Sequence, residues 1–236
     1  MQLLARWQGA PASKSNRAPY SLMSIGNFCR TRYQIDQFMN SVSPGYEPVS
    51  LFFDWLFLGG LLGVIDLFRR DFEIVEDDIG VHSGKEGFIP RDKRSGMGFR
   101  HDFGTRHEPW ESLDECRLHM ANEMKDSLEK FRYLAVRTRA FMAEKNVALI
   151  YQSRKSEQRH LHLLAQQLLQ VIRSKYSGQF LFVNVIEEGK GVSLFGESIV
   201  TVAVNDDGCP KNDTPEWWQG SDESWSRAFS SIFSPE

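Results

Sequence analysis

The chain has 236 residues, of which 41% are apolar and 25% are charged, and its net charge is −3. These values are close to globular averages and exclude a chain that is disordered throughout. The slightly acidic balance gives no electrostatic basis for binding nucleic acid or an anionic membrane surface, so we expect neither partner.

The three cysteines are too few and too far apart for a disulfide framework, and no Cys-x-x-Cys pair suggests zinc. We therefore expect a reducing, cytoplasmic compartment. The longest apolar run, residues 56–65, is too short to cross a bilayer, so we expect no membrane span. Residues 1–19 lack the basic start and hydrophobic core of a secretory signal. We expect a flexible leader over 1–19 and a single α/β domain over 20–236.

The N-terminal part of this domain predicts a strand, a tight glycine turn and a helix. Residues 20–25 form a short, mostly apolar run that stops at Gly26, and apolar side chains at helical spacing follow from residue 28 to residue 38. Serine, proline and glycine between residues 40 and 48 predict a loop. In the apolar block that follows, residues 61–68 predict an amphipathic helix that ends near Arg69.

The middle of the chain is polar and rich in glycine. Residues 72–103 predict a small β-rich insertion, a hairpin or meander whose last strand is residues 98–103. From residue 111 to residue 145, apolar side chains recur three or four positions apart opposite a charged face. This spacing predicts a long amphipathic helix, with room for one break.

The last third of the chain predicts strands at residues 147–151, 180–186 and 198–204. A helix that Ser156 would cap separates the first two strands. Continuous apolar strands separated by helices favour parallel pairing with helices on both faces. We therefore predict the α/β class: a three-layer domain with a mainly parallel, Rossmann-like sheet and a β-rich insertion around 72–103.

Cys29 is the first candidate catalytic residue, because it lies in the first turn of the helix that follows the glycine turn. Unpaired N–H groups and the helix dipole stabilise an anion at such a position, and Arg30 and Arg32 add positive charge. We therefore expect a lowered thiol pKa, which a cysteine nucleophile needs. The alternative is a small buried cysteine that packs beneath the sheet.

A thiolate nucleophile needs a base, and His101 is the strongest candidate among the six histidines because it lies between Phe99 and Phe103. On a strand these three side chains would share one face, which would bury the imidazole and require a partner for it. The alternative is a core histidine with a purely structural partner.

An acidic residue is expected to orient that imidazole, Asp54 first and Asp102 second. Asp54 lies in a strongly apolar block, where a carboxylate is costly to bury unless it is paired. It is therefore expected to orient His101, to form an ion pair with an arginine such as Arg32, or to cap the next helix.

Substrate contacts are expected from residues next to these groups, namely Asn27, Arg30 and Trp55. No glycine-rich phosphate loop and no metal-ligand spacing is present, so we expect no cofactor and no metal. Three of the six tryptophans lie within residues 217–225. They predict either a platform for stacking carbohydrate or packing of the C-terminal segment onto the domain.

Three segments, in this order, resemble a bacterial family classed as papain-like cysteine peptidases. They are residues 24–29 (Ser-Ile-Gly-Asn-Phe-Cys), 53–55 (Phe-Asp-Trp) and 99–103 (Phe-Arg-His-Asp-Phe). Family members carry Ser-Leu-Gly-x-x-Cys, Pro-Phe-Asp-Trp and His-Asp-Phe at these places, so Ile25 and Phe52 are the departures.

The resemblance extends from about Tyr20 to the C-terminus and implies a nucleophile at Cys29 with His101 as its partner. Papain-like sites also use a later Asn or Asp, for which Asn184 and Asn205 are further candidates.

Three functions fit the sequence. The first is a cysteine-nucleophile hydrolase, of the papain-like peptidase or acyl-transfer type, which acts on a peptide or acyl substrate through Cys29 and His101. The second is an enzyme that transfers or modifies a sugar or nucleotide-sugar, with a structural Cys29 and a carbohydrate ligand bound by Asp54, His101 and the C-terminal tryptophans. The third is a non-catalytic binding module with a buried Cys–His–Asp cluster.

Overall fold

The computed structural model describes residues 20–26, 29–54, 56–57, 59–85, 87–104, 109–187, 192–194, 197–205 and 218–233. The expected leader, residues 1–19, and the candidate substrate contacts Asn27 and Trp55 lie outside these ranges. None of the helices within them is both long and apolar enough to cross a membrane.

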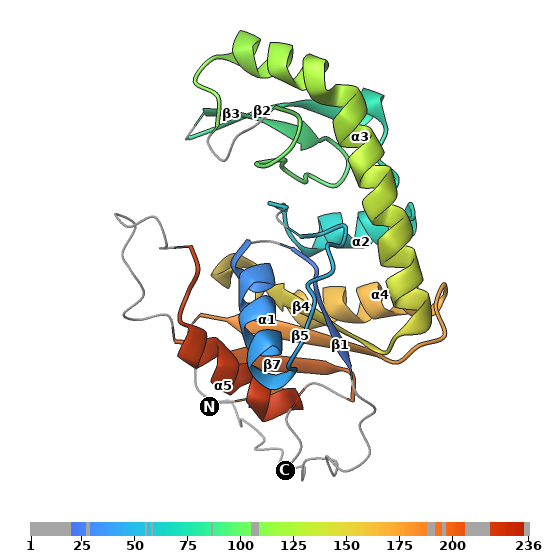
Figure 1. The fold of residues 1–236 in the computed structure, drawn as a ribbon, viewed down its shortest axis with the longest axis vertical. Coiled ribbons are helices and arrows are strands. Elements are labelled where there is room, and N and C mark those ends of the chain that lie inside the picture. The colour runs from blue at the N-terminus through green and yellow to red at the C-terminus, as the bar shows by residue number, and fades with distance from the viewer. Residues whose placement is uncertain are drawn as a thin grey trace, which may run out of the picture.

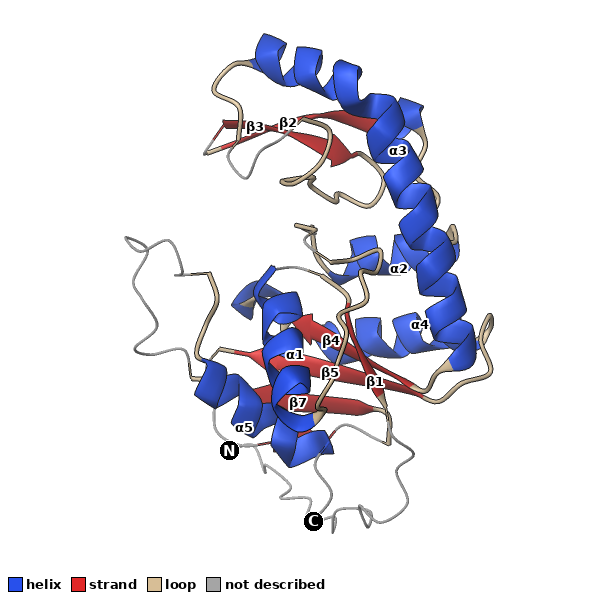
Figure 2. Cartoon of the chain, in the orientation of Figure 1, coloured by secondary structure: helices blue, strands red, loops and turns tan. Residues whose placement is uncertain are grey.

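A five-stranded sheet forms the middle layer of the molecule (Figures 1 and 2). Its order is β1-β4-β5-β7-β6; the first four strands are parallel, and β6 pairs antiparallel with β7 at one edge. All six residues of β4 are buried, as expected for a parallel strand that is covered on both faces. The sequence analysis did not predict β6. The strands are β1 (Ser21–Ser24), β4 (Val147–Gln152), β5 (Phe180–Ile186), β6 (Val192–Leu194) and β7 (Ile199–Ala203).

Helices cover both faces of this sheet (Figure 2). Alternate strand residues point to opposite faces: Leu149 and Phe182 pack toward α2 and α4, whereas Ile150 and Val183 pack toward α1 and α5. The predicted three-layer α/β class is therefore confirmed. The helices are α1 (Cys29–Val42), α2 (Leu61–Arg69), α3 (Leu113–Glu144), α4 (Leu161–Arg173) and α5 (Asp222–Phe233).

The β-rich insertion is a hairpin of β2 (Ile79–Gly84) and β3 (Gly87–Asp92), which packs on the N-terminal part of α3. The predicted long helix is present without a break, as the 32 residues of α3. At 1.5 Å per residue the axis of α3 measures about 48 Å in all. The helix bends: its first turns lie across the hairpin, and the rest runs along one side of the molecule to the sheet (Figure 1).

The prediction of a strand over residues 98–103 is wrong, because the segment turns toward α3 after its first residue. Gly98 forms an isolated bridge with Phe57, and the next residues form bends and a turn. Phe103 has a φ of 55°, which is incompatible with a strand. Its backbone N–H donates to Ser127 Oγ of α3 at 2.9 Å. A helix side chain, and not a neighbouring strand, therefore binds the backbone of this turn.

The prediction that Ser156 caps a helix is also wrong. Residues Lys155–Glu157 form one 3₁₀ turn, and α4 begins only at Leu161. The turn closes because the Glu157 carboxylate accepts hydrogen bonds from the Arg154 backbone N–H at 2.9 Å and the Tyr151 hydroxyl at 2.7 Å.

The C-terminal helix α5 packs along α1 over one face of the sheet (Figure 1). Trp225 is fully buried there and contacts Phe229, whose ring in turn meets Phe38 of α1 edge-on at 5.3 Å. Of the two roles expected for the C-terminal tryptophans, Trp225 therefore has the packing role, because its buried ring is inaccessible to a sugar.

Replacing Trp225 should destabilise the domain because it removes the largest buried side chain beneath α5. We expect Trp225→Ala to lower the free energy of unfolding by about 3–5 kcal/mol. Leu163→Ala is the control, because Leu163 is 54% exposed on α4 and should change stability by less than about 0.5 kcal/mol. Denaturant unfolding of both variants makes the comparison, and equal small effects would contradict the burial of Trp225.

Candidate active site

Cys29 lies beside the carboxyl ends of the parallel strands. Ile25 extends the pairing of β1 by donating to the Ile150 carbonyl at 3.0 Å, and Gly26 then adopts a φ of 93°, which favours glycine. The chain reverses at this edge and enters α1 with Cys29 as its first residue. The carboxyl ends of parallel strands are where open α/β sheets bind their ligands.

The sulfur of Cys29 contacts the imidazole of His101. The Sγ–Nε2 distance is 3.5 Å, although the two residues are 72 positions apart in the sequence. His101 comes from the segment between β3 and α3, and both side chains are half-buried. The two groups expected to share a site thus lie within hydrogen-bonding reach, the geometry that a thiol nucleophile and its general base require.

Backbone hydrogen bonds fix the segment that carries His101. Gly98 exchanges two hydrogen bonds with Phe57, at 2.7 and 3.2 Å, and Phe99 donates to the Pro90 carbonyl at 3.0 Å. On the other side of His101, the Phe103 ring packs on Phe99 with centroids 4.5 Å apart. The imidazole is therefore placed by the hairpin and α3 together, which favours a preorganised site.

Burial raises the pKa of the Cys29 thiol, although its own backbone N–H and the positive charge of Arg100 lower it. The expectation of a lowered thiol pKa is therefore wrong in direction. Cys29 does lie in the first turn of a helix, but the desolvation of the thiol outweighs the stabilisation of the thiolate by that position. Arg30 and Arg32, which were expected to lower the thiol pKa further, form ion pairs with other residues. Arg32 forms ion pairs with Asp54 and Asp36, both at 2.9 Å, and Arg30 pairs with Glu187.

Asp54 belongs to a buried structural ion pair. Its Oδ2 accepts from Arg32 at 2.9 Å and from the Leu51 backbone N–H at 2.8 Å, and its Oδ1 has no hydrogen-bond partner. Burial raises the pKa of Asp54 to about 6, against the lowering effect of Arg32. Of the roles expected for Asp54, the ion pair with Arg32 is therefore present, whereas Asp54 does not orient His101.

Asp102 pairs with Lys130 of α3 through its Oδ1. Of the other two candidates for a third member, Asn184 is engaged inside the sheet, where its amide donates to Thr201 Oγ1 at 3.3 Å, and Asn205 donates through its backbone N–H to Ser224 Oγ. The hydrogen bonds described for the Asp102 and Asn184 side chains go to Lys130 and Thr201, not to His101. The orienting role given to Asp102 as second choice is therefore not observed.

Arg30 holds the C-terminal segment against the sheet edge. Its Nε donates to the Trp218 carbonyl at 2.9 Å, and its NH1 donates to Glu187 Oε1 at 2.9 Å. Glu187 follows β5 and also accepts from Gln152 at the end of β4. These contacts make Arg30 a structural link beside the site, and its expected role as a substrate contact stays a prediction.

The sequence analysis missed Arg100 and Arg154. Arg100 directly precedes His101, and Arg154 follows the strand β4 at the same sheet edge as Cys29. Both guanidinium groups stack on the ring of Phe57, with carbon-to-centroid distances of 5.1 and 5.3 Å. The sequence could have indicated both residues, because Arg154 follows a predicted strand and Arg100 precedes the candidate histidine. It could not have indicated that both contact the ring of Phe57.

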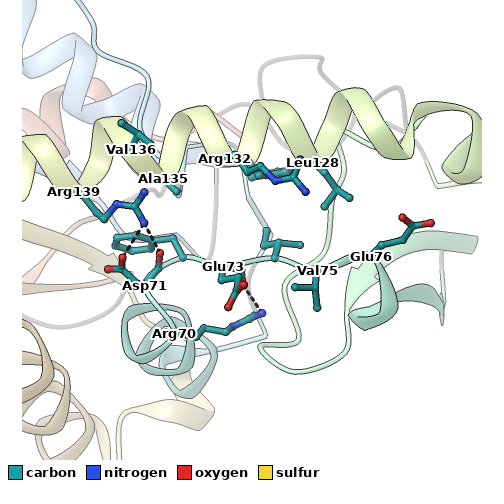
Figure 3. A pocket seen from close by; sticks show the side chains of 13 residues that line it. Arg70, Asp71, Glu73, Val75, Glu76, Leu128, Arg132, Ala135, Val136 and Arg139 are labelled. Carbon is teal, nitrogen blue, oxygen red and sulfur yellow. Dashed lines mark hydrogen bonds and ion pairs between the residues drawn. The ribbon is translucent and has the colours of Figure 1, made fainter.

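A separate cavity of about 500 Å³ lies between α3 and residues 70–76 (Figure 3). Arg139 pairs with Asp71 at 2.8 Å on its wall, and Arg70 donates to the Glu73 carbonyl. Neither Cys29 nor His101 lines it. Across the part of the chain that the structure describes, no three His, Cys, Asp or Glu side chains gather in a way that would hold a metal ion.

No protein-family model, curated protein or solved structure matches this chain. Its function is therefore inferred from the chemistry of the site.

The raised thiol pKa predicts how Cys29 reacts with pH. Because burial stabilises the neutral thiol, the rate of alkylation by iodoacetamide should rise with a midpoint above that of the same cysteine in unfolded protein. Arg100→Gln should move this midpoint further up, since the Arg100 charge lowers the thiol pKa, whereas Arg132→Gln on the exposed face of α3 should leave it unchanged. Peptide mapping by mass spectrometry follows the reaction; a midpoint below the unfolded value would contradict the burial argument.

Replacement of Asp54 and replacement of Asp102 should lower the free energy of unfolding by different amounts. Asp54→Asn should lower the free energy of unfolding by about 2–4 kcal/mol, because it breaks a buried ion pair. Asp102→Asn should cost less than about 1 kcal/mol, because its partner Lys130 is 51% exposed. Neither variant should alter the pH profile of Cys29 alkylation. A large change in that profile with an intact fold in Asp54→Asn would restore Asp54 to the catalytic site.

Proposed function

We propose that this protein is a cysteine-nucleophile hydrolase or acyl-transfer enzyme of the papain-like peptidase type, with Cys29 as nucleophile and His101 as general base. The observation that carries the proposal is the 3.5 Å contact between Sγ and Nε2 at the carboxyl edge of a parallel sheet. The ordered motifs around Cys29, Asp54 and His101, which resemble that peptidase family, support it independently.

The first half-reaction forms a covalent intermediate. Cys29 Sγ attacks the carbonyl carbon of the substrate while its proton passes to His101 Nε2, and a C–S bond forms. The tetrahedral species then collapses, and the leaving amine, alcohol or thiol takes the proton from His101. The product of this step is a thioester between the acyl group and Cys29.

The second half-reaction releases the acyl group. Water, or another acceptor in acyl transfer, attacks the thioester while His101 accepts its proton. The C–S bond breaks, and the proton returns from His101 to the Cys29 sulfur. His101 thus serves as base and acid in turn, which its contact with the sulfur allows.

The neutral resting thiol fits this sequence of proton transfers. Because burial disfavours the Cys29 thiolate before substrate binds, deprotonation is coupled to attack, and a nearby base becomes essential. Backbone N–H groups in the first turn of α1 and the charge of Arg100 would stabilise the oxyanion that develops. Cys29 and Cys116 are both free thiols, which suits a reducing, cytoplasmic setting.

The sugar-modifying alternative has less support. It needs Asp54 and the C-terminal tryptophans as ligand contacts, yet Asp54 is engaged by Arg32 and Trp225 is fully buried. The non-catalytic alternative makes a distinct prediction, namely no turnover of any acyl substrate.

Turnover of a panel of thioesters, activated esters and fluorogenic peptides tests the proposal. Cys29→Ala should abolish hydrolysis, and His101→Ala should lower kcat/KM by about 10²–10⁴-fold, the usual contribution of a general base. Cys116→Ala is the matched control, since it removes a buried thiol remote from the sheet edge. Activity that survives in Cys29→Ala, or no activity on any substrate class in the folded wild type, would overturn the assignment.

A further inference from the structure

Side chains on one face of α3 bind the three residues that follow His101. In the order of the turn, they are Lys130 on the Asp102 carboxylate, Ser127 on the Phe103 backbone N–H at 2.9 Å and Glu123 on the Gly104 backbone N–H at 3.0 Å. Positions 123, 127 and 130 are three or four residues apart, so they share one face of the helix. The helix therefore holds every residue of the turn that begins next to the imidazole.

The turn depends on these contacts because its backbone is left-handed. Phe103 has a φ of 55° and Gly104 a φ of 83°. A bulky residue such as phenylalanine adopts this conformation only at a cost in free energy. The backbone also comes so close to α3 that a Cβ at position 104 would lie 2.6 Å from the Cβ of His119. Contacts with α3, and not a local preference of the sequence, thus determine the shape of the turn.

Ser127 makes the central contact of the three. Its hydroxyl and the Phe103 N–H are both buried, and a buried N–H without an acceptor is costly, so the hydroxyl determines where the Phe103 backbone lies. Serine is a weaker helix former than alanine or leucine, yet Ser127 lies in the interior of a 32-residue helix. Its role as acceptor gives a physical reason for a serine at this position.

The same part of α3 also holds the chain through the rings on either side of His101. Phe131, one turn after Ser127, stacks on the Phe103 ring with centroids 6.0 Å apart and meets the Phe99 ring edge-on at 5.1 Å. Phe99 lies two residues before His101 and Phe103 two residues after it. Since His101 Nε2 is 3.5 Å from the Cys29 sulfur, a shift of this backbone against α3 would change that distance.

We propose that Ser127 and Glu123 are positioning residues, which act through the turn at residues 102–104 to hold the His101 imidazole against the Cys29 sulfur. The inference rests on the proposed function for the role of His101 as a base, and it adds the residues that place this base. Lys130 contributes least, because an ion pair of a side chain that is 51% exposed is screened by solvent.

Steady-state kinetics on an acyl substrate test the placement of the base. Ser127→Ala should lower kcat by about 10-fold, because a displacement of about 1 Å can slow a catalysed reaction by up to about 100-fold. KM should stay within about 2-fold, since no contact with substrate is removed. Ser127→Thr keeps the hydroxyl and should retain most of the activity.

Glu123 offers a second set of variants on the exposed surface of α3, which serves if Ser127→Ala does not fold. Glu123→Ala removes the acceptor of the Gly104 N–H and should lower kcat by a smaller factor than Ser127→Ala. Glu123→Gln keeps an acceptor oxygen and should have the wild-type kcat. Glu129→Ala, which removes another exposed carboxylate of α3, is the matched control and should also leave kcat unchanged.

Alkylation of Cys29 by iodoacetamide tests the same placement without an acyl substrate. A base in contact accepts the thiol proton as the sulfur attacks, so His101→Ala should lower the alkylation rate at fixed pH. Ser127→Ala should lower the rate in the otherwise wild-type protein and have no further effect in the His101→Ala background. A residue that acts through His101 has nothing left to position once the imidazole is gone, and the double-mutant cycle measures this.

The two experiments separate the two proposals. The expected alkylation cycle without hydrolysis of any acyl substrate would support the positioning role and reject the hydrolase. Hydrolysis that needs Cys29 and His101 but proceeds with the wild-type kcat in both Ser127→Ala and Glu123→Ala would reject the positioning role alone. Equal losses from Ser127→Ala with and without His101 would also overturn it, because the loss would then come from a general effect on the fold. Alkylation that does not depend on His101, in a protein without turnover, would reject both.

Discussion

The contact between the Cys29 sulfur and the His101 imidazole is the interaction on which the functional account depends, because each partner is held by a different part of the fold. The sheet supplies the sulfur: a parallel strand ends, Gly26 reverses the chain, and a helix begins at Cys29. The hairpin and α3 supply the imidazole through the bridge between Phe57 and Gly98 and the turn at Phe103. The insertion is thus necessary for the site, since the sheet alone carries a thiol without a base.

Burial decides how charge is distributed around this contact. It raises the pKa of the Cys29 thiol in spite of the helix start, and the buried Asp54 pairs with Arg32 inside the domain instead of with the imidazole. The charge of Arg100 lowers the pKa of the Cys29 thiol, and Arg100 shares the Phe57 ring with Arg154. A buried thiol with a base in contact fits a nucleophile that is deprotonated as it attacks, which is the step that the proposed mechanism requires.

The sequence predicted those features that depend on local pattern. The apolar runs at β4 and β5 and the helical spacing of α3 indicated the layers, and the strand–glycine–helix pattern placed Cys29 correctly. The alternation around His101 predicted a strand that does not exist, because the left-handed Phe103 and its bond to Ser127 are tertiary features. The partner of Asp54 and the shared ring of Phe57 could not be predicted for the same reason, since each joins segments that are distant in the sequence. The alternation nevertheless selected His101 among the six histidines, and the ordered motifs independently pointed to its pairing with Cys29.

The most direct measurement of the central claim is cross-linking with a short bis-alkylating reagent, 1,3-dibromoacetone, which joins a thiol only to a nucleophile in its immediate vicinity. The protein is treated with one equivalent, digested, and mapped by mass spectrometry. A contact of 3.5 Å predicts a single dominant product in which the Cys29 peptide is joined to the His101 peptide. A Cys29 adduct joined to another residue, or one that stays unlinked in the folded protein, would contradict it.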